Sequence, residues 1–118
     1  MDYDATDSVF GAWETLCRHL EARNRELNAE VAHYPTPIAR CDVQLSKLLE
    51  QRARLYRELE GAESIGALPP AGGALARWLD GVEHFVLSAQ ADCDDADELA
   101  LLRDLKRAIA SQRRRAIA

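Results

Sequence analysis

The spacing of apolar residues constrains the fold of this chain more than any other feature. Through residues 9–34 these side chains follow alternating steps of four and three positions, if Arg23 and Glu30 fill the two gaps, which places them along one side of an α-helix. Similar spacing returns after each of two segments rich in proline or glycine, at 34–37 and 61–73. We therefore predict an all-α fold. The first row of apolar residues consists of Val9, Trp13, Leu16, Leu20, Leu27 and Tyr34.

Residues 8–60 are predicted to form a long antiparallel helical hairpin. The Tyr-Pro-Thr-Pro segment at 34–37 stops the first helix, because proline cannot continue the backbone hydrogen-bond ladder. The threonine before the second proline has the pattern of an N-cap, so we expect the next helix to begin at once. If the two rows meet face to face, residue x pairs with about residue 72 − x. Leu16 then meets Tyr56.

Residues 74–115 are predicted to form a second, shorter hairpin. The segment 61–73 contains the Pro-Pro and Gly-Gly pairs, so we interpret it as a linker. The acidic stretch at 92–98 is expected to cap the fourth helix, because carboxylates stabilise a helix N-terminus. We expect one helical domain over residues 1–118. The two hairpins either close a four-helix bundle, or the long one protrudes in the manner of a coiled coil and pairs with another chain.

Charge and cysteine usage narrow the possible partners. The formal net charge of −5 makes nucleic acid an unlikely main partner. The three cysteines are an odd number without CxxC spacing, so they indicate neither a disulfide framework nor a zinc site. No run approaches the roughly 20 apolar residues that span a bilayer, and the acidic start does not resemble a secretory signal. We expect a cytoplasmic protein without a membrane segment.

Two short patterns suggest metal chemistry, and both are incomplete. The acidic stretch at 92–98 fails the EF-hand pattern, since Ala96 and Arg103 occupy positions that require calcium ligands. Glu30 and His33 form one Glu-x-x-His unit, whereas di-iron bundles use two. We therefore predict no metal ligand, no cofactor and no catalytic residue.

The second helix also carries the pattern Asp42-x-x-Leu45-x-x-Leu48-Leu49-x-x-Arg52-x-x-Leu55. This pattern resembles the long first helix of the all-helical chorismate mutases. The resemblance implies a small helical enzyme in which Arg52 binds a substrate carboxylate. The other two cations of that family fall on Pro35 and Glu63 here. Without them a doubly anionic substrate lacks its clamp, so this enzyme is a disfavoured alternative.

The leading interpretation is a non-enzymatic protein that self-associates as a homodimer or docks onto another protein. A long hairpin that the short one cannot cover would expose an apolar row, and such rows mark interfaces. The aromatic anchors expected near the open end of the hairpin are Phe10, Trp13 and Tyr56. The rigid turn is a second expected docking surface, formed by His33, Tyr34, Pro35, Pro37 and Arg40.

The basic C-terminal end supports an alternative function. Residues Arg113, Arg114 and Arg115 could contact phosphates, as in a small nucleic-acid-associated regulator. Cations in a last helical turn also complement the helix dipole, which explains them without any ligand.

Overall fold

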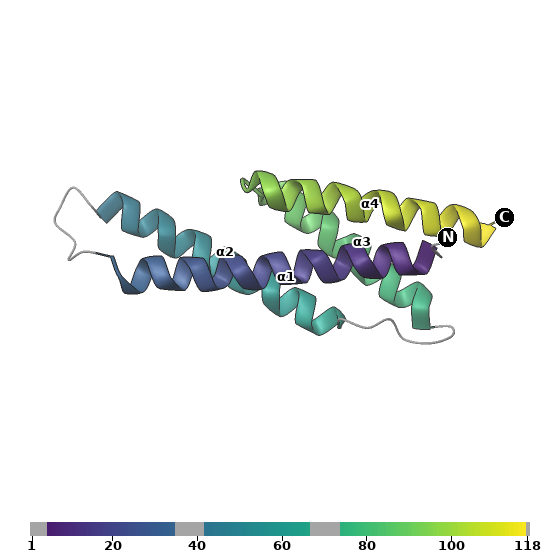
Figure 1. The fold of residues 1–118 in the computed structure, drawn as a ribbon, viewed down its shortest axis with the longest axis horizontal. Helices are drawn as coiled ribbons and strands as arrows, with labels where there is room; N and C mark the ends of the chain where they lie inside the picture. The colour runs from purple at the N-terminus through teal and green to yellow at the C-terminus, as the bar shows by residue number, and fades with distance from the viewer. Residues whose placement is uncertain (1–4, 35–41, 67–73, 118) are drawn as a thin grey trace.

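The structure is a computed structural model that describes residues 5–34, 42–66 and 74–117. Those ranges contain four helices and no strand, so the predicted all-α fold is confirmed (Figure 1). Within the same ranges, no helix is both long enough and apolar enough to cross a membrane. The helices are α1 (Ala5–Ala32), α2 (Asp42–Ile65), α3 (Ala74–Asp92) and α4 (Ala96–Ile117).

The four helices form a ring in which α1 and α3 each lie against both α2 and α4. The molecule measures 61 × 26 × 22 Å, because the α1–α2 hairpin extends well beyond the α3–α4 hairpin (Figure 1). The turn between α3 and α4 meets α1 at His19 and α2 at Arg54. Past these two contacts α1 and α2 continue together toward their own turn (Figure 1). We call residues 24–34 and 43–53 the overhang.

The core fills the centre of the ring. The apolar row predicted for the first helix is buried from Val9 to Leu27, where exposed fractions do not exceed 2%. Apolar residues of the third and fourth helices also lie inside. Helix α2 contributes only Leu55 and Ala62 among the described residues, because its N-terminal half lies in the overhang. The other buried core residues are Leu55, Ala62, Trp78, Leu79, Val82, Phe85, Val86, Ala89, Leu102, Leu105 and Ile109.

The predicted pairing of the long hairpin is shifted. The hydroxyl of Tyr56 donates a hydrogen bond to Asn28 at 3.1 Å, whereas the predicted partner of Tyr56 was Leu16. The hydroxyl of Tyr34 similarly reaches Gln44 at 3.3 Å. The two helices are thus displaced along each other by several residues. The prediction assumed a tight turn at 34–37, whereas α2 is described only from residue 42. Residues 35–41 lie outside the described part of the chain.

Helix α2 also ends later than predicted. Residues 61–65, assigned to the linker by sequence, continue the helix to Ile65. Burial of Ala62 in the core offsets the helix-breaking tendency of Gly61, and the first proline follows only at residue 69. Gly66 then ends the helix with a φ of 92°, a left-handed conformation that glycine adopts without a steric cost. Its amide donates to the carbonyl of Ala62 at 3.0 Å.

Candidate functional site

Two expected docking anchors belong to the aromatic core. Trp13 is completely buried, and its ring meets that of Phe85 edge to face at a centroid distance of 5.2 Å. Its indole N–H donates to the carbonyl oxygen of Gly66 at 3.1 Å. Phe10 is half-buried, with its ring centroid 5.4 Å from that of Trp78. This burial corrects the expectation that Trp13 offers an exposed ring, because α3 and the end of α2 cover the open end of the hairpin.

The third expected anchor, Tyr56, lies at the surface with 43% of its area exposed. The guanidinium carbon of Arg52 lies 6.0 Å from the centre of the Tyr56 ring, within the range of cation–π attraction. Leu49, 39% exposed, precedes Tyr56 by two helical turns and therefore shares its side of α2. We call the row Leu45, Leu49, Arg52 and Tyr56 the outer α2 face.

The turn residues lie partly inside and partly outside the described part of the chain. His33 is exposed, and its Nδ1 lies 2.9 Å from the carbonyl oxygen of Ala29, which fits a hydrogen bond within the last turn of α1. Tyr34 is half-buried through its contact with Gln44. The remaining expected docking residues of the turn lie outside the described residues; these are Pro35, Pro37 and Arg40.

The basic C-terminal end is partly occupied by ion pairs within the molecule. Arg113 donates to Asp80 at 2.8 Å and to Glu83 at 3.4 Å, both on α3. Arg114 is exposed, and the side chain of Arg115 lies outside the described residues. The contacts of Arg113 hold α4 against α3, so this residue has a structural role that the sequence pattern alone does not indicate.

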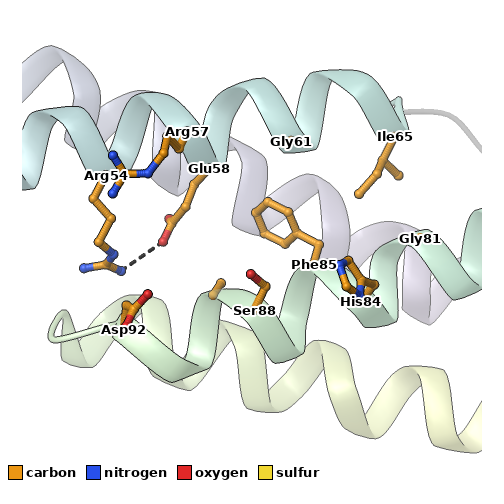
Figure 2. Close-up of a pocket in the computed structure, with 11 residues that line it drawn as sticks. Arg54, Arg57, Glu58, Gly61, Ile65, Gly81, His84, Phe85, Ser88 and Asp92 are labelled. Carbon is orange, nitrogen blue, oxygen red and sulfur yellow. Dashed lines mark hydrogen bonds and ion pairs between the residues drawn. The ribbon is translucent and has the colours of Figure 1, made fainter.

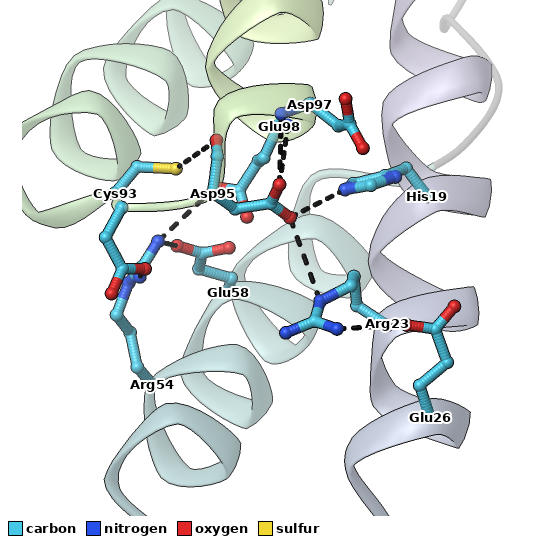
Figure 3. A network of polar contacts seen from close by, with 10 residues as sticks. His19, Arg23, Glu26, Arg54, Glu58, Cys93, Asp95, Asp97 and Glu98 are labelled. Atoms are coloured by element: carbon cyan, nitrogen blue, oxygen red, sulfur yellow. Dashed lines mark hydrogen bonds and ion pairs between the residues drawn. The ribbon is translucent and has the colours of Figure 1, made fainter. Parts of the chain in front are cut away.

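A cluster around Arg54 forms where the α3–α4 turn meets α2 (Figure 3). Arg54 donates to Glu58 at 2.9 Å and to Asp94 at 3.3 Å, and its Nη2 lies 3.5 Å from Glu98 Oε2. The side chains of Glu58 and Glu98 are only 10% and 4% exposed. We call these four residues the arginine cluster. It places two buried carboxylates against a single guanidinium.

The presence of two buried carboxylates beside one guanidinium determines how the arginine cluster binds protons. Burial, followed by repulsion from Glu98, raises the pKa of Glu58 to about 7, although attraction to Arg54 opposes the rise. The Oε2 atoms of Glu58 and Glu98 are buried and accept no hydrogen bond from a donor among the described residues. Near neutral pH Glu58 therefore carries a proton part of the time, and it is the group of the cluster that can exchange it.

A second polar contact joins the same turn to α1. Asp95 caps α4, because its Oδ1 accepts hydrogen bonds from the backbone amides of Asp97 and Glu98 at 3.0 and 3.4 Å. Its Oδ2 lies 2.9 Å from His19 Nε2 and 3.8 Å from Arg23 Nε. Burial opposes ionisation, but the hydrogen bonds from His19 and the two amides lower the pKa of Asp95. The prediction that the acidic stretch caps the fourth helix is confirmed.

Neither described thiol has the character of a nucleophile. Burial, followed by repulsion from Glu21 and Glu14, raises the pKa of Cys17 to about 11. Burial also raises the pKa of Cys93 to about 11, although a hydrogen bond to the backbone of Asp95 opposes the rise. Both thiols stay protonated near neutral pH, and only a thiolate attacks efficiently.

A cleft of about 440 Å³ opens between α2 and α3, next to the arginine cluster (Figure 2). Glu58 and Asp92 lie at its polar end, and Figure 2 shows the Glu58 carboxylate pointing from α2 into the space above α3. Gly61 and Gly81 line the opposite, apolar part from the two facing helices. Its remaining lining residues are Arg54, Arg57, Ile65, His84, Phe85, Ser88 and Ala89.

Comparison with known proteins gives no information on the role of the cleft or of the outer α2 face, so both are interpreted from their chemistry. No protein-family model, no curated protein and no solved structure matches this chain. The resemblance to the chorismate mutases has no counterpart in the geometry of the cleft. Arg52 lies on the outer α2 face, and neither Arg52 nor the exposed Glu63 lines the cleft.

Neither the arginine cluster nor the cleft was predicted from the sequence. Two local signals point to parts of them: Arg54 and Glu58 have the spacing of a helical ion pair, and Glu98 follows the capping Asp95 by three residues. Arg54 and Glu58 come close to Glu98 only because of the offset between the two hairpins, and this offset could not be predicted from the sequence. Gly61 was assigned to the linker, so its place inside a helix was missed as well.

Proposed function

We propose that this protein is a non-enzymatic docking protein whose outer α2 face binds an amphipathic helix of another protein. The single observation that carries the proposal is the exposure of Leu49, in the overhang, and of Tyr56, just beyond it, on one side of α2. Large apolar side chains exposed two turns apart form the kind of row that a helical partner covers. Aromatic and arginine residues together are also typical of interface hot spots, and Arg52 lies between the two apolar residues.

The charge of the outer α2 face favours a different chain over a second copy of this one. The row from Leu45 to Tyr56 has its midpoint near Arg52. A two-fold axis through that midpoint would bring the Arg52 side chains of two copies together, and like charges at such a contact are unfavourable. A partner helix with a carboxylate opposite Arg52 avoids this cost. Homodimer formation through the same face is therefore the weaker alternative.

The size of the surface sets the expected strength of binding. The segment from Val43 to Tyr56 spans about 21 Å of helix, and two adjacent helices are about 20 Å wide. One side of the contact is then about 400 Å², roughly half of what a standard specific interface buries on each partner. We expect a transient complex of micromolar affinity.

The proposal is tested by comparing three full-length proteins as immobilised baits in extract from the native cells. One is the wild type, one carries Leu49→Ser with Tyr56→Ser, and the matched control carries Leu87→Ser, since Leu87 is 52% exposed on α3. We expect one protein to be retained by the wild type and by the control, and to be lost with the double variant. Arg52→Glu should also release it.

Two results would contradict the proposal. Retention of the same proteins by all baits would show that the outer α2 face is not used. A dimeric mass in light scattering that becomes monomeric in the double variant would identify a second copy as the occupant.

A further inference from the structure

We propose that the cleft between α2 and α3 binds a primary amine with an apolar chain, its ammonium group held at the Glu58 carboxylate and its chain along the Gly61–Gly81 part. This site is on the opposite side of α2 from Tyr56 and goes beyond the docking function. At about 440 Å³ the cleft has the size of a small-molecule site.

The apolar part of the cleft depends on two glycines inside helices. A Cβ atom at Gly61 would lie 3.5 Å from the Phe85 ring, and one at Gly81 would lie 3.6 Å from Ile65. Both distances are ordinary van der Waals contacts, so neither position requires glycine for close approach. Neither has the positive φ that requires glycine. Each nevertheless forgoes the helix stability of alanine, and the open volume between them is what the glycines preserve.

The polar end of the cleft has an excess of negative charge. Glu58 and Asp92 line it, and Asp94 and Glu98 stand behind Glu58 around the guanidinium of Arg54. Three carboxylates, Glu58, Asp94 and Glu98, thus lie within 3.5 Å of the half-buried guanidinium of Arg54. Asp92 lines the cleft as a fourth, whereas Arg57 is exposed at the rim. A cationic ligand reduces this excess, and an anionic ligand increases it.

Glu58 supplies the acceptor for the ammonium group. Its side chain is nine-tenths buried, and one oxygen accepts a hydrogen bond from Arg54. Its Oε2 accepts none from any donor in the described part of the chain, and the carboxyl group of Glu98 lies beside it. A buried acceptor without a donor is unfavourable, and an ammonium group offers three donors on a small head. Phe85 lies between this carboxylate and the glycines, so an attached chain of methylene groups would lie against its ring.

Binding is expected to compete with the proton on Glu58. An alkylammonium stays charged at pH 6 and at pH 8, as lysine does, whereas Glu58 changes from mostly protonated to mostly ionised across a pKa of about 7. The dissociation constant should therefore fall about ten-fold from pH 6 to pH 8. The titratable and charged groups around Glu58 on all elements packed against it are Arg23, Arg54, Arg57, Asp92, Cys93, Asp94, Asp95 and Glu98.

The test titrates the full-length protein with hexylamine, hexanol and hexanoate at pH 8 and follows backbone amide signals by NMR. The three probes share one chain and differ in head charge. We expect shifts at Gly61, Gly81 and Ser88, and a dissociation constant for hexylamine at least ten-fold below those of the other two. Equal binding of the three probes, or tighter binding of hexanoate, would overturn the proposal.

Variants separate the site from general effects on folding. Glu58→Gln should weaken hexylamine at least ten-fold and leave hexanol unchanged, while Glu63→Gln, an exposed residue of the same helix, should change neither. Gly61→Ala with Gly81→Ala should weaken all three probes without loss of stability. His84→Gln should preserve the pH dependence. Unchanged hexylamine binding in Glu58→Gln, or a pH dependence that disappears with His84, would show that Glu58 does not hold the amine.

Discussion

Trp13 and Trp78 donate their indole N–H groups to the same acceptor, the carbonyl oxygen of Gly66, at 3.1 and 3.3 Å. The rings meet edge to face with centroids 6.4 Å apart. Trp13 comes from α1, Trp78 from α3, and Gly66 directly follows α2. One carbonyl therefore joins three helices at the end of the bundle opposite the overhang.

Because the acceptor is shared, the two indoles should be energetically coupled. Trp13→Phe and Trp78→Phe each remove one donor and some ring volume, at an expected cost of about 1 to 3 kcal/mol in the free energy of unfolding. After either change the carbonyl keeps a donor, and only the double variant leaves it unsatisfied. In urea unfolding of the four proteins, the loss in free energy of unfolding of the double variant should exceed the sum of the losses of the two single variants. Strict additivity would argue against a shared acceptor.

Asp95 should contribute to stability in two separable ways. Asp95→Asn keeps a capping oxygen but removes the charge beside His19 and Arg23, whereas Asp95→Ala removes both. At pH 7 we expect the free energy of unfolding to fall by about 1 kcal/mol in Asp95→Asn and by about 2 kcal/mol in Asp95→Ala. Because folding lowers the pKa of Asp95, the contribution of its charge is present above the unfolded value and disappears as the pH falls below it. Thermal unfolding at pH 7 and pH 3 measures both effects; an asparagine cost that persists at pH 3 would contradict them.

Glu58 should make the protein less stable as the pH rises. Its pKa is near 4.5 in the unfolded chain and about 7 in the fold, so the folded state holds more protons between these values. Stability from this residue is complete below about pH 4.5 and is lost up to about pH 7, by on the order of 3 kcal/mol. The free energy of unfolding of Glu58→Gln minus that of the wild type should therefore be larger at pH 8 than at pH 5. Urea midpoints at the two pH values measure this difference, with Glu63→Gln as the control that should show none.

Substitution of the cleft glycines should raise the stability of the fold, whereas the tryptophan and Asp95 variants should lower it. Gly61→Ala and Gly81→Ala each add a methyl group at ordinary contact distance inside a helix, so each should stabilise the fold by about 0.5 to 1 kcal/mol. Denaturant titration of both single variants measures the gain. A loss of stability at either position would mean that the helices need glycine for close packing, and the open cleft would then have a structural cause.

Periodicity predicted the parts of the fold that depend on one helix at a time. Val9 to Leu27 are buried because a row on one side of a helix has to face its neighbours. The position of Tyr56 opposite Asn28 was beyond this reasoning, since the offset of two helices depends on the path of the connection between them. Trp13 illustrates the same limit: its place at the open end of the hairpin suggested exposure, but the ends of α2 and α3 close over it.

The candidate sites were less accessible from sequence than the fold. Of the residues on the outer α2 face, only Tyr56 was among the expected docking anchors. The arginine cluster joins Arg54 on α2 to Glu98 on α4, residues 44 positions apart, and no local pattern specifies that meeting. Tertiary contacts of this kind follow from the relative placement of the two hairpins.

Site-specific cross-linking in native cells tests the docking function most directly. A photoreactive amino acid replaces Leu49 in one protein and Leu87 in the control, two exposed leucines on different helices. We expect an adduct with one other protein from position 49 and none from position 87. An adduct of twice the mass of the chain would indicate self-association instead, and no adduct, or equal adducts at both positions, would contradict docking through the outer α2 face.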